Sequence, residues 1–465
     1  MPLAAADLPL PLDRSAAEPL TAQLTARLRA AIRDGALAAG ERLPGSRTLA
    51  AALGVSRTVV MEAYAQLYAE GWLEGRHGSG TYVADVHPDP APAAGPVPVD
   101  AAFADAPPDG CVDLRPGIPW VGDLNTPAWR RAWRQAAEIA PSGRADPWGL
   151  AGLRAALCEH MRRTRGVTCR PEQVVVTRGA TNGLDMLAAA VLRPGDRVGV
   201  EEPGYGRARA VLEARGAEVV PCPVDEHGLV VDALPEGLRL IYTTPSHQYP
   251  LGGVLPVPRR QALLAWARRT GTLVAEDDYD GEFRFDVAPL PALYGLDPET
   301  VVYLGTMSKR LTADIGVGWL AARPGLAAAV ARRRLELSDR TAVVPQEAVR
   351  LLLERGDLDR HIRRMRAEYA RRRAVVVEAF AGLPLRGEGA GLHLVVELPR
   401  DLTERVTAAA AGEGLLLDSL VRHYAGAPTA AGLVIGYGAT RAALLRDGCR
   451  RVRALIDELG GGRTG

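Results

Sequence analysis

The first hundred residues show a helical spacing of apolar side chains. Apolar residues recur every four positions from 20 to 32, which predicts a helix with one buried face. Two shorter helices are predicted over 47–53 and 57–70, with Ser46 and Ser56 as N-cap residues. After them, two short apolar runs flank the glycine-rich stretch EGRHGSG, which is typical of a β-hairpin.

These elements have the spacing of a winged helix-turn-helix. This motif needs a small residue where the helices cross, which is Ala50, and a glycine in the turn, which is Gly54. It also needs an apolar anchor on the second helix, which is Val60. The second helix would present Ser56, Arg57 and Thr58 to phosphates and base edges in the major groove, and Arg47 could reach a phosphate. The alternative is a small capped helical domain that does not bind DNA.

The chain then changes character twice. Residues 84–110 are rich in Pro and Ala and nearly free of large apolar side chains, so they predict an extended spacer. This divides the chain into a winged-helix domain (16–83), a linker (84–110) and a large domain (111–465).

In the large domain, apolar strands alternate with amphipathic helices. This pattern predicts an α/β domain with a mostly parallel sheet. Residues 325–381 are predicted to be helical, and residues 441–459 form the last helix. The expected strands are Val174–Thr177, Val198–Glu201, Leu240–Thr244, Thr272–Glu276, Val301–Leu304, Leu392–Glu397 and Leu433–Ile435.

Composition excludes several classes of protein. The 465 residues are 47% hydrophobic and 24% charged, with a net charge of +1, so neither a disordered chain nor a strongly basic one is indicated. No apolar run reaches the ~20 residues of a membrane helix, and the amino terminus lacks the basic start of a signal peptide. The five scattered cysteines indicate neither a zinc site nor a disulfide framework. We therefore expect a cytoplasmic protein without a bound metal or membrane contact.

The most informative residue is Lys309, because it is the only lysine among 56 basic residues. The base composition of the genome explains why arginine replaces lysine at positions where any cation suffices. Lysine, unlike arginine, can lose its proton and act as a nucleophile. Lys309 follows the predicted strand Val301–Leu304, at the end of a strand where α/β sheets bind ligands.

Other polar groups follow neighbouring strands. One strand ends in Glu-Asp-Asp-Tyr-Asp (276–280), and another runs into the glycine turn Arg-Gly-Ala-Thr-Asn (178–182), which opens a helix. A helix amino terminus binds phosphate. Amine, carboxylate, phenol and phosphate cradle are the groups that pyridoxal 5'-phosphate (PLP) requires. Each of these groups alone is a weak signal; an acidic run, for example, is usually solvated surface.

Two resemblances cover nearly the whole chain. RLPGSRTLAAALGVSRTVVMEAYAQLYAEGWLEGRHGSGTYVA resembles the GntR-family winged helix. VVVTRGATNGLDMLA, TPSHQYPLGGVLPVPRRQALLAWA, EDDYDGEFRFDVAPLPALYGLD and VVYLGTMSKRL resemble fold type I aminotransferases, and more narrowly the MocR/GabR group of regulators.

The resemblance implies roles for individual residues. Lys309 would form the Schiff base with PLP, Asp277 would pair with the ring nitrogen, and Tyr279 would bond the ring hydroxyl. The other implied roles are ring stacking for Tyr205, phosphate binding for Ala180, Thr181 and Thr306, binding of an effector carboxylate for Arg207 and Arg422, and DNA contacts for Arg47, Ser56, Arg57, Thr58, His77 and Gly78.

The chain departs from the aminotransferase pattern beside the lysine. Gly316 stands where the family places a phosphate-binding arginine, and Ala313 and Leu251 replace a usual proline and a small hydroxyl residue. Loss of one charge-assisted contact of roughly 1.5–3 kcal/mol would weaken PLP binding by about 10- to 100-fold. Arg310 is close enough in sequence to compensate.

We therefore expect a homodimeric transcription regulator that binds operator DNA. PLP or a small amine effector held at Lys309 would modulate DNA binding by amine exchange rather than full catalytic turnover. Two alternatives remain: a regulator whose large domain has lost PLP and serves only for dimerisation, and a true aminotransferase.

Overall fold

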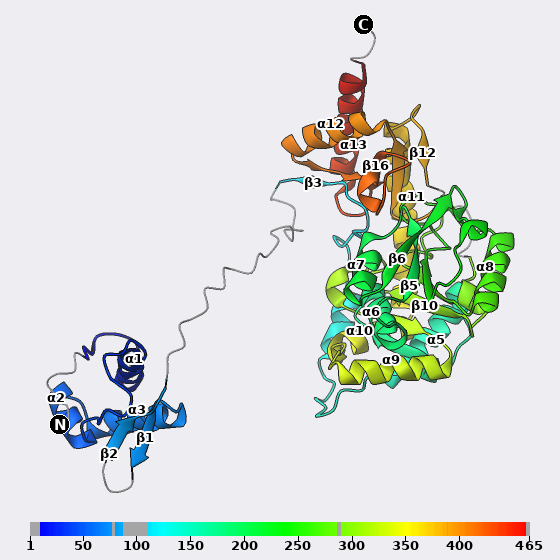
Figure 1. Ribbon diagram of the computed structural model, residues 1–465. Helices are drawn as coiled ribbons and strands as arrows, with labels where there is room; N and C mark the ends of the chain where they lie inside the picture. Colours follow the sequence, from blue (N-terminus) through cyan, green and yellow to red (C-terminus); the bar gives the residue numbers. More distant parts are fainter. Residues whose placement is uncertain (1–9, 77–79, 87–109, 286–289, 388, 462–465) are drawn as a thin grey trace. The chain divides into compact units, whose positions relative to one another are not determined.

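The computed structural model describes residues 10–76, 80–86, 110–285, 290–387 and 389–461. The chain divides into two compact units, Met1–Ala104 and Asp105–Gly465 (Figure 1). Most of the predicted linker, 87–109, lies outside the described residues, so its extended form stays a prediction.

The amino-terminal unit contains the three predicted helices, α1 (Leu20–Arg33), α2 (Ser46–Leu53) and α3 (Arg57–Ala69). Leu24, Leu28 and Ile32 of α1 are buried, as the four-residue spacing predicts. They pack with Leu49, Val60 and Leu67 of the other two helices in a single core. Gly54 adopts a left-handed conformation (φ +64°) in the turn between α2 and α3, where a side chain would be strained.

The predicted hairpin is present. β1 (Leu73–Arg76) pairs antiparallel with β2 (Gly80–Val83). Leu73 and Val83 belong to the same core as the buried residues of the three helices. His77 and Gly78, which come between these strands in the sequence, lie outside the described residues. Their predicted DNA contacts therefore remain predictions.

The two predicted N-caps had different outcomes. Ser56 caps α3, because its Oγ accepts a hydrogen bond from Val59 N at 3.4 Å. The prediction for Ser46 is wrong: Ser46 is already the first residue of α2, and Gly45 is the N-cap. The Ser46 hydroxyl instead accepts from Arg57 Nε at 3.3 Å, a tertiary contact that local sequence does not reveal.

The large unit is built on an eight-stranded sheet of order β4-β11-β10-β9-β8-β5-β6-β7. Neighbours from β10 through β6 are parallel, while β11 and β7 run antiparallel. The mostly parallel sheet is thus confirmed. Its strands are β4 (Val174–Thr177), β5 (Arg197–Glu202), β6 (Glu218–Asp225), β7 (Gly228–Leu229), β8 (Leu240–Thr243), β9 (Leu273–Asp278), β10 (Val301–Thr306) and β11 (Gly318–Ala321).

Helices cover both faces of this sheet, so its strands are apolar on both sides (Figure 1). In β10, Val301 and Tyr303 belong to one core, whereas Val302 and Leu304 belong to the other. The first core is shared with α5 (Ala151–Arg165), α8 (Val257–Thr270) and α10 (Val343–Glu354), and the second with α6 (Ala180–Val191), α7 (Gly206–Ala214) and α9 (Pro324–Glu336).

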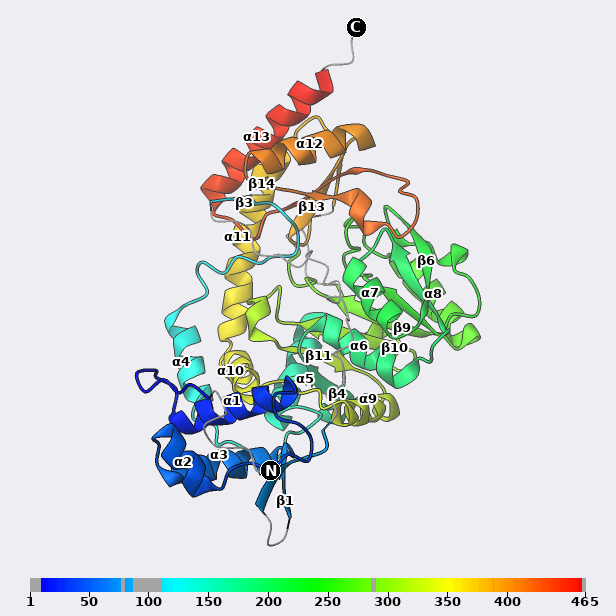
Figure 2. The ribbon, with the colours of Figure 1, turned by 60° about the vertical axis from the view of Figure 1, so that its left-hand side comes forward.

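A second, four-stranded sheet forms the carboxyl-terminal layer. The long helix α11 (Asp357–Ala379) reaches from α10 to this layer, where it packs on α13 (Figure 2). The predicted helical region 325–381 is thus divided into three helices. The remaining elements are α4 (Pro127–Ala136), α12 (Arg400–Gly412), α13 (Ala442–Gly460), β3 (Val112–Asp113), β12 (Leu385–Arg386), β13 (His393–Glu397), β14 (Leu415–Leu416), β15 (Asp418–Ser419) and β16 (Gly432–Gly436).

In the ranges that the structure describes, the helices are too short or too polar to span a bilayer. The same ranges hold no cluster of three or more His, Cys, Asp or Glu side chains arranged for a metal ion.

Candidate functional site

The predicted site residues converge because their strands point the same way. β9 and β10 are parallel, and β4 has the same direction as β10 because both are antiparallel to β11. Their carboxyl ends therefore meet at one edge of the sheet. The chain leaves this edge at Asp277, at Thr306 and at the glycine turn after Thr177.

Lys309 lies in the turn that follows β10, and its side chain is partly buried. Its amine donates a hydrogen bond to the main-chain oxygen of Gly117, which is 192 residues away in the sequence. Burial lowers the pKa of the amine, and the charges of Asp280 and Asp277 oppose this shift. A lowered pKa increases the fraction of neutral, nucleophilic amine.

Asp277, the second-last residue of β9, is a buried carboxyl group with one free oxygen. Tyr242 on β8 donates its hydroxyl to Oδ2 at 2.6 Å. Oδ1 is buried and accepts no hydrogen bond from the residues that the structure describes. Burial raises the pKa of Asp277 to about 7, although the Tyr242 hydrogen bond lowers it. A buried oxygen of this kind suits a cationic or N–H donor from a ligand.

Tyr279 is held by the loop that follows β8. Its hydroxyl donates to the main-chain oxygen of His247 at 3.0 Å and lies 2.9 Å from the His247 Nδ1. The same Nδ1 lies 2.9 Å from Asp280 Oδ2. Tyr279 therefore belongs to a network of Tyr, His and Asp groups next to Lys309.

Tyr205 connects the glycine turn to this network. It hydrogen-bonds Thr181 at the start of α6, and its ring meets Tyr249 edge-on at 5.7 Å. Burial raises the pKa of Tyr205, while the Thr181 hydrogen bond and the charge of Arg207 lower it. The phenol thus lies close to the amino terminus of α6.

The glycine turn lies beside the Lys309 loop. Gly179 is the N-cap of α6, so Ala180 and Thr181 begin the helix with free amides. A Cβ placed on Gly179 would lie 3.7 Å from Thr306 Oγ1 and 4.0 Å from Ser308 Oγ. Thr306 Oγ1 bonds Ser308 Oγ at 2.9 Å. Two hydroxyls therefore lie next to the start of α6, where free amides can bind a phosphate.

Arg310, next to Lys309 in the sequence, is held by other partners. Its guanidinium pairs with Glu282 at 2.6 Å, contacts the main-chain oxygen of Thr306, and stacks over Trp319 at 5.2 Å. Gly316 has φ +55°, and a Cβ there would meet no atom within 4 Å. Arg310 therefore does not compensate for Gly316, because its charge is paired with the buried carboxylate of Glu282.

The two predicted effector arginines come from different elements. Arg207 is the second residue of α7. Arg422 lies in the short 3-10 helix Leu420–His423, with a side chain that is 74% exposed and 3.5 Å from Asp418. Burial raises the pKa of Tyr249, and the charges of both arginines lower it. Both cations therefore lie close enough to act on one tyrosine.

The predicted DNA-contacting residues lie at two helix starts of the amino-terminal unit. Arg47, Ser56, Arg57 and Thr58 are all exposed, and the Arg57–Ser46 hydrogen bond joins the starts of α2 and α3. Arg42 was missed in the sequence. A Cβ on Gly80 would lie 3.0 Å from its Nε, so Arg42 adds a cation beside the wing.

Comparison with known families agrees with this geometry. Residues 20–83 match the model of bacterial regulatory proteins of the gntR family, and residues 112–429 match aminotransferase class I and II. Similarity to known transcription regulators extends over nearly the whole chain. A pyridoxine biosynthesis transcriptional regulator, PdxR, of Corynebacterium glutamicum is 38% identical over 93% of this chain and 95% of its own.

The chain belongs to the MocR-type transcriptional regulators. The probable rhizopine catabolism regulatory protein MocR of Rhizobium meliloti is 35% identical over 96% of this chain and 95% of its own. Among solved structures, the α-aminoadipate aminotransferase LysN of Thermus thermophilus superposes with a TM-score of 0.68 and 25% identity. The match covers 76% of this chain and 94% of LysN, which was solved with N-(5'-phosphopyridoxyl)-L-leucine.

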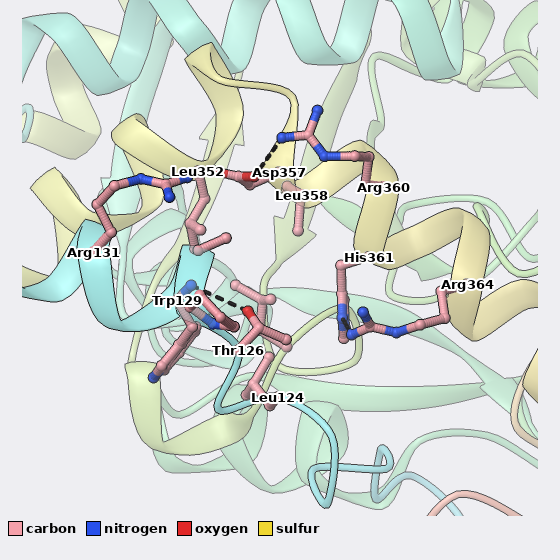
Figure 3. Close-up of a pocket in the computed structure, with 13 residues that line it drawn as sticks. Leu124, Thr126, Trp129, Arg131, Leu352, Asp357, Leu358, Arg360, His361 and Arg364 are labelled. Carbon is pink, nitrogen blue, oxygen red and sulfur yellow. Dashed lines mark hydrogen bonds and ion pairs between the residues drawn. The ribbon is translucent and has the colours of Figure 1, made fainter.

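This MocR-type chain also has a cavity away from the predicted site. About 450 Å³ lies between α4, α10 and α11, and Figure 3 shows Trp129 and Leu352 facing it from opposite helices. Arg360, paired with Asp357, lies at its edge. Leu311, two residues after Lys309, also lines the cavity, but none of the predicted cofactor or effector residues does.

Several site residues of this MocR-type protein were missed in the sequence. Tyr242 gave a weak signal, as a phenol inside an apolar strand. Gly117 gave none, because only folding brings it to Lys309. Three histidines also lie close to the site: His393 and His423 approach Tyr249 at 5.2 Å, and His247 contacts Tyr279.

Proposed function

We propose that this protein binds operator DNA through its winged helix and that PLP, or an amine that reacts with it, changes that binding from a site at Lys309. The observation that carries the proposal is the position of the chain's only lysine. Its amine is partly buried, and the carboxylates of Asp277 and Asp280 act on its pKa.

The residues around Lys309 fit PLP. When bound, PLP supplies an aldehyde that reacts with primary amines and a ring that withdraws electrons. Lys309 would hold it covalently, and the free Oδ1 of Asp277 would accept from the ring nitrogen while Tyr242 orients the carboxylate. Tyr279 would bond the ring hydroxyl, Tyr205 would stack on the ring, and the phosphate would lie at Ala180, Thr181 and Thr306.

Two kinds of effector agree with the site. Arg207 and Arg422 can bind a carboxylate, which favours an amine that also carries an acid group. The C. glutamicum relative is named as a regulator of pyridoxine biosynthesis, which favours PLP itself as the signal. In either case, the ligand must bind two arrangements of the protein with unequal affinity, or no signal reaches the DNA-binding domain.

The DNA-binding part of the proposal rests on exposed residues at helix starts. Arg47, Ser56, Arg57 and Thr58 would contact phosphates and base edges, and the wing residues His77 and Gly78 would contact the backbone. We propose a cytoplasmic homodimer, because two winged helices can then read two half-sites. Exposed Ile118 and Val121 follow Gly117 in the chain, and they offer an apolar surface for the second copy.

A second candidate is a dimeric regulator without PLP. Gly316 favours it, because a glycine stands where the family places a phosphate-binding arginine. The orientation of Arg310 favours it too, because this guanidinium pairs with Glu282 instead. True aminotransferase activity is the remaining alternative, and the site has the lysine that it would need.

A visible spectrum of the purified full-length chain, with and without added PLP, separates these functions. We expect an absorbance band that borohydride removes, with the cofactor retained on the protein. We then expect operator affinity to change on titration with PLP or carboxylated amines. Absence of any band at saturating PLP would favour the cofactor-free regulator, and sustained keto-acid production from an amine donor would favour the enzyme.

A further inference from the structure

Two cysteines that play no part in the proposed site lie in contact. Cys158 is on α5, and Cys169 is in the segment that joins α5 to β4. Their sulfur atoms are 3.4 Å apart, and both residues are partly exposed. Cys222 and Cys449, in contrast, are buried, and all five cysteines are free thiols. A pair of accessible thiols at van der Waals distance is a candidate for reversible oxidation.

The backbone on both sides fixes this contact. Gly166 ends α5 in a left-handed conformation (φ +65°), and Val167 N then bonds back to Met161 O at 3.2 Å. The reversal returns the chain along α5. Arg154, one turn before Cys158, donates to the main-chain oxygen of Pro171 at 2.7 Å, just beyond Cys169. The two sulfur atoms are therefore held together without a covalent bond.

The two thiols have different environments. The Cys169 thiol donates its proton toward the Cys158 sulfur. This hydrogen bond lowers the pKa of Cys158, with a smaller contribution from the Arg154 charge, while burial and the charge of Glu172 oppose the shift. The pKa of Cys169 is raised by its hydrogen bond to Cys158 and by burial. Cys158 is thus the stronger candidate for the nucleophilic thiolate, and Cys169 for the protonated partner.

We propose that Cys158 and Cys169 form a reversible disulfide when the protein meets hydrogen peroxide. The Cys158 thiolate attacks one peroxide oxygen, the O–O bond breaks, and a sulfenic acid and hydroxide result. The Cys169 sulfur then attacks the Cys158 sulfur, the S–O bond breaks, and the departing hydroxide takes the Cys169 proton as water. The first hydroxide takes up the proton that Cys158 released on ionisation. Two thiols are thus oxidised and one peroxide is reduced to two waters.

The reaction needs only a small movement. The sulfur atoms must approach from 3.4 Å to the bonding distance of about 2.05 Å, which rotation about the side chains can supply. The bond would tie α5 to the segment that leads through β4 into the Gly179 turn. The proposal is independent of DNA binding and of PLP, since it rests on the thiols alone.

Peptide mapping of the full-length wild-type protein tests the proposal without any variant. After brief treatment with dilute hydrogen peroxide, we expect loss of two of the five thiols, a mass decrease of about 2 Da, and a cross-linked peptide pair containing Cys158 and Cys169. Dithiothreitol should restore both thiols. The thermal midpoint of the oxidised protein should rise, because the bond closes a loop.

Variants sharpen the test. Cys158→Ser and Cys169→Ser should each abolish the mass decrease, whereas Cys111→Ser, at a partly exposed cysteine, should leave it unchanged. Three results would overturn the proposal: five thiols that survive treatment, oxygen addition at Cys158 without a cross-link, and a cross-link between two chains instead of within one.

Discussion

Tyr242 and Asp277 form the central hydrogen bond of the candidate site, with the phenol donating to Oδ2 over 2.6 Å from the neighbouring strand. The bond fixes the carboxyl group and leaves Oδ1 as a buried acceptor with no partner among the described residues. A buried acceptor of this kind is costly unless a ligand completes it. The pair is therefore organised for a ligand rather than for the stability of the empty protein.

The first prediction concerns pH and the cofactor-free protein. The pKa of Asp277 is raised to about 7, above its unfolded value near 3.9, so the folded state retains the proton over this range. Wild-type stability should therefore fall as pH rises from about 4 to 7. Asp277→Asn should remove this contribution and stabilise the protein at pH 8 by at most about 4 kcal/mol.

Thermal unfolding across that pH range checks the first prediction. The exposed Asp447 on α13 supplies the control, Asp447→Asn, which should follow the wild-type curve. Parallel pH profiles for wild type and Asp277→Asn would show that Asp277 is ionised in the folded protein.

The second prediction tests whether Lys309 is required for the covalent bond to PLP but not for folding or DNA binding. Lys309→Ala should abolish the visible band that borohydride removes, because alanine has no amine, and should leave cofactor-free operator binding within about twofold. Lys309→Arg keeps a positive charge but cannot lose its proton, so it should lose the band equally. Absorbance spectra and a gel-shift titration measure both effects. A band that persists in either variant would contradict the role of Lys309.

The third prediction addresses the missing phosphate arginine. Gly316→Arg should tighten PLP binding about tenfold or more relative to Gly316→Ala, since only arginine adds a charge near the predicted phosphate. Both variants carry the same strain at φ +55°, so both should lose roughly 1–2 kcal/mol of stability. Fluorescence titration with PLP measures the difference. Equal affinities would mean that position 316 does not face the phosphate.

The fourth prediction concerns the start of α3. Arg57→Ala should weaken operator binding and reduce the slope of log affinity against log salt by about one, because one phosphate contact is lost. The cofactor spectrum should not change. Arg33→Ala, an exposed arginine of α1 paired with Asp34, is the matched control. If the Arg57 and Arg33 variants behave alike across the salt series, Arg57 does not contact DNA.

The fifth prediction tests the proposed dimer. Val121 is 49% exposed and lies close in sequence to Gly117, the partner of Lys309. Val121→Arg should shift the protein toward monomer, because it places a charge in the proposed apolar interface. Leu444→Arg changes a side chain that is 46% exposed on α13 and should remain dimeric. Sedimentation velocity distinguishes the two, and a dimeric Val121→Arg protein would place the interface elsewhere.

Helices and strands were predicted well where periodicity was strong. β4 has the predicted bounds, and α1 and α3 end within a few residues of theirs, because a buried face imposes a regular spacing on the sequence. The cap at Ser46 was predicted wrongly, although its local sequence resembled that at Ser56. Tertiary contact decided the difference, since Ser46 bonds Arg57 of the next helix.

The sequence by itself determined the order of domains and the alternation of strands and helices, and it singled out a lone lysine as the candidate nucleophile. These follow from local periodicity and from the chemistry of single residues. Only the tertiary structure decided which groups meet that lysine: Gly117 comes from 192 residues away, and Arg310, adjacent in sequence, turns toward Glu282. A side chain's direction depends on partners that folding brings together from distant segments, and on the cost of leaving a buried charge unpaired.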